Sequence, residues 1–141
     1  MSVSFLPDPS RLKLNKIISN HESITIDVES IACAALCPLC QQPSRKVHSY
    51  YSRTLADLPW SGFAVSLLIH TRKFYCSTLD CKRKIFTERL PEVARSYARK
   101  TVRLNETLTL IGYVVGGEAE SCLALQIGMS VSPDTLINRI R

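Results

Sequence analysis

Residues 37–60 read CPLCQQPSRKVHSYYSRTLADLPW, and the two cysteines that open this stretch decide the expected fold. Cysteines separated by two residues form one knuckle of a structural zinc site, which takes four ligands. A second knuckle lies further along the chain, in CSTLDC at residues 76–81. The full spacing, C-x2-C-x35-C-x4-C, predicts one structural zinc ion bound by Cys37, Cys40, Cys76 and Cys81.

The interval between the two knuckles carries the pattern of β-strands. KVHSYYSR at 46–53 is rich in β-forming residues, and FAVSLLIHTRKFYC at 63–76 places apolar residues at every second position. DLPWSG, between them, is rich in turn residues. Two knuckles bridged by extended strands are typical of a zinc ribbon, so residues 37–91 are predicted to form a zinc-binding, β-rich module.

Other side chains in the chain could also bind a metal. Cys33, in IACAAL, and Cys122, in a helical run, are interpreted as small buried hydrophobic residues. His48 and His70 stay open as ligands that replace a thiolate or bind a second metal, although single histidines on strands more often pack or face solvent. Four cysteines leave no open coordination position, which favours a structural site over a hydrolytic one.

Beyond Pro91 the apolar period changes from two to between three and four, which predicts a helix ending at Gly116 and Gly117. The expected buried positions are Val93, Tyr97, Ala98, Thr101, Leu104, Leu108 and Ile111. A second helical run, EAESCLALQI at 118–127, stops at Gly128, and SPDTLINRIR at 132–141 begins a third helix with Ser132 as its N-cap. Two short helices around a glycine-containing turn predict a helix-turn-helix.

The positive charge of the chain is concentrated in one segment. The formal net charge is +6, and residues 72–103 hold ten Lys or Arg against three acidic residues, or +7, which leaves −1 elsewhere. This distribution favours a polyanionic partner, with a solvated basic face as the alternative. The helix-turn-helix layout favours double-stranded DNA as that partner, and RNA stays open. The expected DNA contacts are Lys82, Arg83, Lys84, Arg95, Arg99, Lys100, Arg103, Asp134, Thr135, Asn138, Arg139 and Arg141.

Length and composition exclude several classes of protein. The 141 residues allow one ordinary domain or two small ones, and 45% hydrophobic with 21% charged residues is typical of a soluble globular chain. The longest apolar stretch, LTLIGYVVGG at 108–117, is too short to span a bilayer, and the N-terminus lacks the features of a secretory signal. We therefore expect a cytoplasmic protein without a membrane partner.

Four motifs, in this order, resemble the N-terminal region of bacterial insertion-sequence transposases of the ISL-three family. They are CPLC, VHSYYSRTLADLPW, RKFYCSTLDCKRKIFTERLP and YARKTVRL, and the similarity spans about residues 37–141. In that family a zinc-binding module and helix-turn-helix elements precede a ribonuclease-H-like catalytic domain with an acidic metal-binding triad. The resemblance implies zinc ligation by the same four cysteines. The glycine that often follows the family's second cysteine is Gln41 here.

Together these observations predict an α+β fold, a small zinc-ribbon-like β-rich module followed by a helical helix-turn-helix module. The expected divisions are an N-terminal segment with a candidate strand at 1–36, the zinc module at 37–91 and a truncated DNA-binding module at 92–141. The resemblance implies sequence-specific binding to the terminal inverted repeats of an insertion sequence, by a bacterial chain that is nucleoid-associated when bound to DNA.

The same resemblance implies that the chain is not itself an enzyme, because nothing in it corresponds to the ribonuclease-H-like domain. The chain would then be either a fragment left by truncation of the gene or a protein whose catalysis comes from a separately encoded transposase chain. Its expected protein partners are that chain or a second copy of itself. The alternative function is a zinc-ribbon module for protein interaction or regulation without transposition activity.

Overall fold

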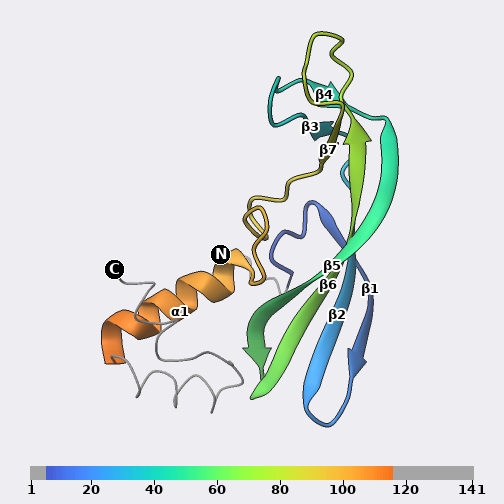
Figure 1. Cartoon of the computed structure of the whole chain (residues 1–141). Helices are drawn as coiled ribbons and strands as arrows, with labels where there is room; N and C mark the ends of the chain where they lie inside the picture. The colour runs from blue at the N-terminus through green and yellow to red at the C-terminus, as the bar shows by residue number, and fades with distance from the viewer. Residues whose placement is uncertain (1–5, 116–141) are drawn as a thin grey trace.

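In the computed structural model, residues 6–115 are described, and strands dominate this part of the chain (Figure 1). Its elements are β1 (Leu12–Ser19), β2 (Ser23–Ser30), β3 (Ala35–Leu36), β4 (Pro43–Ser44), β5 (Val47–Trp60), β6 (Phe63–Tyr75), β7 (Ile85–Thr87) and α1 (Val102–Val115). Figure 1 shows the long β5 and β6 ribbons running from the main sheet to β3 and β4 at one end, with α1 near the other. No helix within the described range is long and apolar enough to cross a membrane.

The main sheet is mixed. Its strand order is β1-β2-β6-β5, and β7 pairs with β6; β2 runs parallel to β6, while the other pairs are antiparallel. The expected strand around Ile24, Ile26 and Val28 is β2, which lies inside this sheet. The two short strands β3 and β4 form a separate antiparallel pair.

β5 and β6 form a long hairpin with a two-residue turn. Ser61 and Gly62 have φ values of 53° and 82°, and positive φ at both central residues matches the right-handed twist of the flanking strands. The turn is shorter than DLPWSG, because β5 continues through Pro59. The proline is tolerated at an irregular part of the pairing, where the register shifts between Asp57 and Trp60.

The main core lies on one face of the sheet. Leu55 of β5 and Leu67 and Ile69 of β6 are at most 1% exposed, as expected for alternate residues that share a face. Leu90 and Val93, from the segment after β7, pack against them. The segment after β7 therefore covers the sheet and completes its core.

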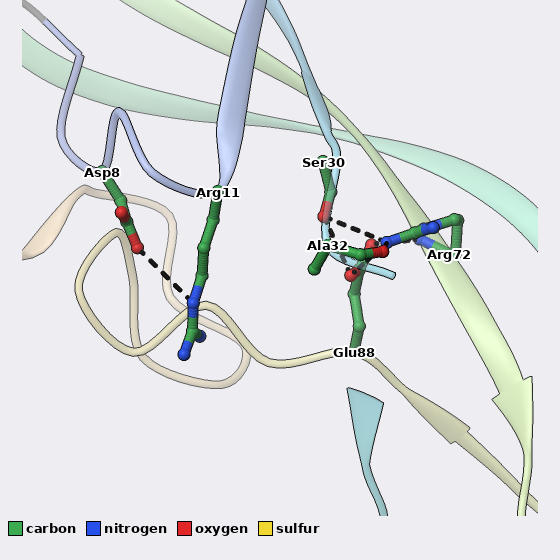
Figure 2. Close-up of polar contacts among 6 residues, drawn as sticks. All are labelled: Asp8, Arg11, Ser30, Ala32, Arg72 and Glu88. Atoms are coloured by element: carbon green, nitrogen blue, oxygen red, sulfur yellow. Dashed lines mark hydrogen bonds and ion pairs between the residues drawn. The ribbon is translucent and has the colours of Figure 1, made fainter. Parts of the chain in front are cut away.

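A buried polar cluster fixes this covering segment to the sheet (Figure 2). Glu88 follows β7, and its carboxylate accepts hydrogen bonds from Arg72 N (2.9 Å) and Nη2 (3.1 Å) on β6 and from Ser30 Oγ (2.9 Å) at the end of β2. Arg72 Nη2 also donates to the carbonyl of Ala32 (2.5 Å). Figure 2 also shows Arg11 pointing toward Asp8, where the Nε to Oδ2 distance is 3.9 Å.

The predicted α+β fold is wrong, because the described chain is mostly β, and no helical module follows the zinc-binding part within residues 6–115. The predicted helix after Pro91 begins only at Val102. Residues 99–101 instead pair with the free edge of β5, since Ala56 N donates to Arg99 O and Thr101 N donates to Ala56 O, both at 2.9 Å. The helix-turn-helix predicted over 118–141 lies outside the described residues.

The apolar period misled the helix prediction because it runs through two unrelated packing environments. Val93 belongs to the core of the main sheet, whereas Leu104 and Leu108 of α1 pack against Ala56 and Leu58 of β5. Between them, Tyr97 has a φ of 61° and is exposed. Thr101 then begins the helix, with its Oγ1 accepting a hydrogen bond from Leu104 N at 3.3 Å.

Candidate metal centre and adjoining basic surface

Four cysteine thiols converge at the end of the β5–β6 hairpin. The Sγ atoms of Cys37, Cys40, Cys76 and Cys81 all lie within 4.8 Å of one another. Cys37 Sγ is 3.9 Å from Cys81 Sγ, and Cys40 Sγ is 3.6 Å from Cys76 Sγ. Tetrahedral zinc with bonds of about 2.3 Å places its sulfur ligands about 3.8 Å apart. The donor set therefore fits one zinc ion, and the expected cofactor site is confirmed.

Local backbone structure positions each thiol pair. Cys37 directly follows β3, and its N–H donates to Gln42 O (3.1 Å), which closes the first knuckle against β4. Cys76 directly follows β6, and its N–H donates to Lys84 O (2.8 Å), which brings the end of the second knuckle back to β6. The long hairpin thus carries the second pair of cysteines to the first.

An aromatic layer lies under the thiols. Phe74 and Phe86 are at most 1% exposed, and their rings stack with centroids 5.9 Å apart. Both belong to the same buried cluster as Cys37 and Cys81. This packing joins the metal centre to the sheet through β6 and β7, so the zinc site and the end of the sheet are expected to fold together.

The surroundings give the thiols different pKa values. The Thr78 side chain, 3.4 Å away, and the N–H of Gln42 lower the pKa of Cys40 to about 6. The N–H of Cys40 lowers the pKa of Cys37. The N–H of Arg83 acts in the same direction on Cys81, but burial and the neighbouring thiols together raise the pKa of Cys81 to about 11. Since the thiolate is the zinc ligand, Cys37 and Cys40 lose their protons to zinc more readily than Cys81.

Gln41 occupies a left-handed backbone position in the first knuckle. Its φ is 61°, the conformation that glycine adopts without strain, and its N–H donates to Cys37 O at 2.9 Å. Left-handed conformation costs other residues roughly 1–2 kcal/mol, whereas glycine adds about 0.4–1 kcal/mol of unfolded-state entropy.

Gln41→Gly is therefore expected to raise the free energy of unfolding of the zinc-bound protein by about 0.5–1 kcal/mol. Denaturant unfolding followed by circular dichroism measures this change. Gln42→Gly, next to it but without a positive φ, is the control and is expected to be neutral or destabilising. A destabilised Gln41→Gly variant would contradict this explanation of the turn.

The alternative ligands lie apart from the four thiols. His70 Nε2 is 2.8 Å from Asp27 Oδ1, and its Nδ1 is 2.7 Å from Ser52 Oγ. His48 packs edge-on against Tyr75. Cys33 is exposed, so its interpretation as a buried hydrophobic residue is wrong. Cys122 lies outside the described residues.

The expected DNA contacts occupy different settings. Lys82, Arg83 and Lys84 follow Cys81 and are exposed, and so are Arg95 and Arg99. Lys100 is partly buried where the chain pairs with β5. Five others, Asp134, Thr135, Asn138, Arg139 and Arg141, lie outside the described residues.

The row of arginines expected on one helix face does not form. Arg95 and Arg99 precede α1, and Arg103, on its first turn, donates from Nε (2.8 Å) and Nη2 (2.5 Å) to the buried carboxylate of Asp57. Arg103 therefore joins α1 to β5, whereas Arg95 and Arg99 are exposed to solvent.

The sequence interpretation missed basic and aromatic residues on the hairpin. Tyr51, Arg53 and Lys73 line an open cavity of about 880 Å³ together with the expected contacts Arg83 and Arg95. Tyr51 and Arg53 alternate along β5, which indicates a shared face, but only the register with β6 places Lys73 beside them.

Comparison with known proteins shows a similarity over the zinc-binding part of the chain. Residues 34–81 match the family model described as the zinc-finger of transposase IS204/IS1001/IS1096/IS1165. No curated protein and no solved structure matches the chain. The matched range contains all four cysteines of the cluster, so the part of the chain that is similar to a transposase zinc finger is the part that can hold one zinc ion.

Proposed function

We propose that this chain is a zinc-dependent DNA-binding protein that recognises the terminal inverted repeats of an insertion sequence during transposition. The observation that carries the proposal is the four-thiol cluster inside a segment similar to a transposase zinc finger. Zinc would hold the two knuckles together and so fix the position of the basic residues that follow Cys81. The proposed role of zinc is structural, since four thiolates complete its coordination.

Exposed cations beside the metal centre support a nucleic-acid partner. Among the basic residues of 72–103, Arg72 and Arg103 pair with the buried carboxylates of Glu88 and Asp57. The exposed residues Lys82, Arg83, Lys84, Arg89, Arg95 and Arg99 form no ion pair within the described part of the chain. Cations that are not neutralised internally are available to phosphates.

Duplex binding is expected to depend strongly on salt. With ~5 phosphate contacts, log affinity falls with log salt concentration at a slope of roughly −4.5. Charge reversal of Arg95 and Arg99 together removes two of these contacts and lowers the slope to roughly −2.7. Fluorescence anisotropy with a labelled duplex, from 50 to about 200 mM salt, measures both slopes.

Lys16→Glu is the matched control, because Lys16 is exposed on β1, outside the basic segment. Arg103 is left intact in this experiment, since its guanidinium binds Asp57. Unchanged duplex affinity after reversal of Arg95 and Arg99 would favour the protein-interaction alternative. Equal affinity for the terminal repeats and a scrambled duplex would remove the sequence-specific part of the proposal.

We also propose that catalysis comes from elsewhere than these described residues. The buried carboxylates of Asp27, Asp57 and Glu88 each bind a basic side chain of the chain itself. Asp27 lies on β2, Asp57 lies on β5 and Glu88 follows β7. This supports a structural role for all three. Incubation of the protein with terminal-repeat DNA and Mg²⁺ or Mn²⁺ is expected to leave the strands intact, and nicking that EDTA abolishes would contradict this part.

A further inference from the structure

An open cavity of about 880 Å³ lies between one face of the β5–β6 hairpin and the segment 83–97. Its floor is made by alternate residues of the two strands, with Tyr51 directly opposite Thr71 and Arg53 directly opposite Ile69. The Arg53 guanidinium also donates to the carbonyl of Ala98. Ala98 directly follows the segment 83–97, which forms the wall of the cavity. The bond from Arg53 therefore attaches the end of this wall to the floor on β5.

The charge of the cavity is strongly positive. Arg53 and Lys73 extend from the floor, and Arg83, Arg89 and Arg95 extend from the wall. The acidic residue among those that line it is Glu88, whose carboxylate already binds Arg72 and Ser30. A ligand of this cavity is therefore expected to be anionic, and the spread of the cations over both sides fits a chain of phosphates.

Two tyrosines give the cavity aromatic surfaces. Tyr97, on the rim, is 94% exposed and has a φ of 61°, a conformation that is strained for an aromatic residue. Strained residues held in place by their surroundings are concentrated at binding sites. Tyr51, on the floor, has the Lys73 ammonium 5.7 Å from its ring centroid. An exposed aromatic ring beside cations can stack on a base.

Thr71 provides a third, independent sign of a ligand. It lines the cavity and is only 3% exposed, yet its Oγ1 is a buried polar atom without a hydrogen-bond partner in the described structure. An unsatisfied buried hydroxyl destabilises a fold by about 1–3 kcal/mol. A polar group of a ligand in the cavity would satisfy it.

We propose that this cavity binds a short segment of single-stranded DNA, with Tyr97 and Tyr51 stacking on bases and the five cations contacting the backbone. Duplex DNA is read by a protein element that enters its grooves, whereas a single strand enters a concave basic channel and stacks its bases on aromatic side chains. The choice of DNA over RNA rests on the proposed function. Arg83 and Arg95 are also expected duplex contacts, so the test of the single-strand site uses Tyr97 and Thr71, which line the cavity and are not among those contacts.

The direct test measures the affinity of the full chain for labelled oligo(dT) of 12 nucleotides by fluorescence anisotropy. Tyr97→Ala is expected to weaken binding by roughly 5- to 150-fold, the range for one base–aromatic stack, while Tyr97→Phe retains it. Tyr50→Ala is the matched control, because Tyr50 is 77% exposed but precedes Tyr51 on β5 and points to the opposite face.

A second variant separates ligand binding from folding. Thr71→Val is expected to weaken oligo(dT) binding several-fold while the melting temperature stays equal or rises, because the hydroxyl has no internal partner to lose. A fall in stability together with unchanged affinity would assign Thr71 a structural role and would count against the cavity as a ligand site.

The outcomes distinguish this inference from duplex binding. Wild-type protein that binds duplex but not oligo(dT), or a Tyr97→Ala variant that binds oligo(dT) like the Tyr50→Ala control, overturns the single-strand site and leaves the proposed function intact. Oligo(dT) binding that depends on Tyr97, in a protein that does not bind duplex, supports the cavity and overturns the proposed duplex recognition. Tighter binding of oligo(rU) than of oligo(dT) overturns the assignment to DNA.

Discussion

Replacing Cys37 or Cys81 with serine is expected to abolish stoichiometric zinc binding and to unfold the strands around the metal centre. Both side chains are buried, at 0% and 7% exposure, in one cluster with Phe74 and Phe86. Zinc binding contributes about 10–16 kcal/mol to the folding of zinc-finger peptides at pH 7. Loss of one of the four ligands is expected to remove a large part of this binding free energy. β3 and β4 pair only with each other, over two residues each, and such a short two-stranded pair has little stability of its own.

Zinc content per chain and thermal unfolding by circular dichroism check this result. Wild-type protein is expected to contain one zinc ion per chain. Cys33→Ser is the matched control, because Cys33 is exposed and outside the cluster, and it should keep both zinc and melting temperature. A Cys37→Ser variant that stays folded with the wild-type melting temperature would contradict the structural role of zinc.

Asp57→Ala is expected to lower the free energy of unfolding by about 3–5 kcal/mol, because it leaves a partly buried guanidinium without its partner. The Asp57 side chain is fully buried and accepts hydrogen bonds from Thr101 Oγ1 and Arg103 Nε, each at 2.8 Å. Those two residues begin α1, so the carboxylate attaches the helix to β5. Denaturant unfolding measures the change, and loss of helical signal should accompany it.

Two comparisons make the Asp57 result specific. Glu29→Ala breaks an exposed ion pair with Lys13, whose N–O distance is 3.7 Å, and is expected to change stability by less than about 1 kcal/mol. The Asp57→Ala/Arg103→Ala double variant should lose less than the sum of the single changes, because the second substitution removes the unpaired charge. Strict additivity would show that the two side chains do not stabilise each other.

The metal centre could be predicted from the sequence because the features that indicate it lie within short segments of the chain. Each cysteine pair forms its own turn, and the strands between them have a clear period of two. Spacing and strand content together were enough to expect that the pairs converge. The left-handed turn at Gln41 could also be expected, because the family that this sequence resembles often has a glycine at that position.

The start of α1 could not be predicted, because pairing with a distant strand decides it. Residues 93–111 have the spacing expected of a helix, but the free edge of β5 offers backbone hydrogen bonds to residues 99–101. Asp57, also on β5, then binds Thr101 and Arg103 and sets where the helix begins. Local periodicity carries no information about either partner.

The cavity residues were missed for a similar reason. Arg53 and Lys73 lie in separate strands, twenty positions apart in the chain, and only the β5–β6 register brings them to one face. The exposed ring of Tyr97 was assigned to the buried stripe of a helix that does not form there. A single strand shows which of its own residues share a face, but not which residues of another strand join them.

The central claim is that zinc, held by the four cysteines, organises a DNA-binding surface. Its most direct test is an anisotropy titration of a terminal-repeat duplex with zinc-loaded protein, with chelated protein, and after zinc is restored. We expect binding with zinc, loss of binding on chelation and recovery when zinc is added back, because all four cysteines belong to one cluster with Phe74 and Phe86 and the exposed basic residues directly follow Cys81. Equal duplex affinity with and without zinc would contradict the claim.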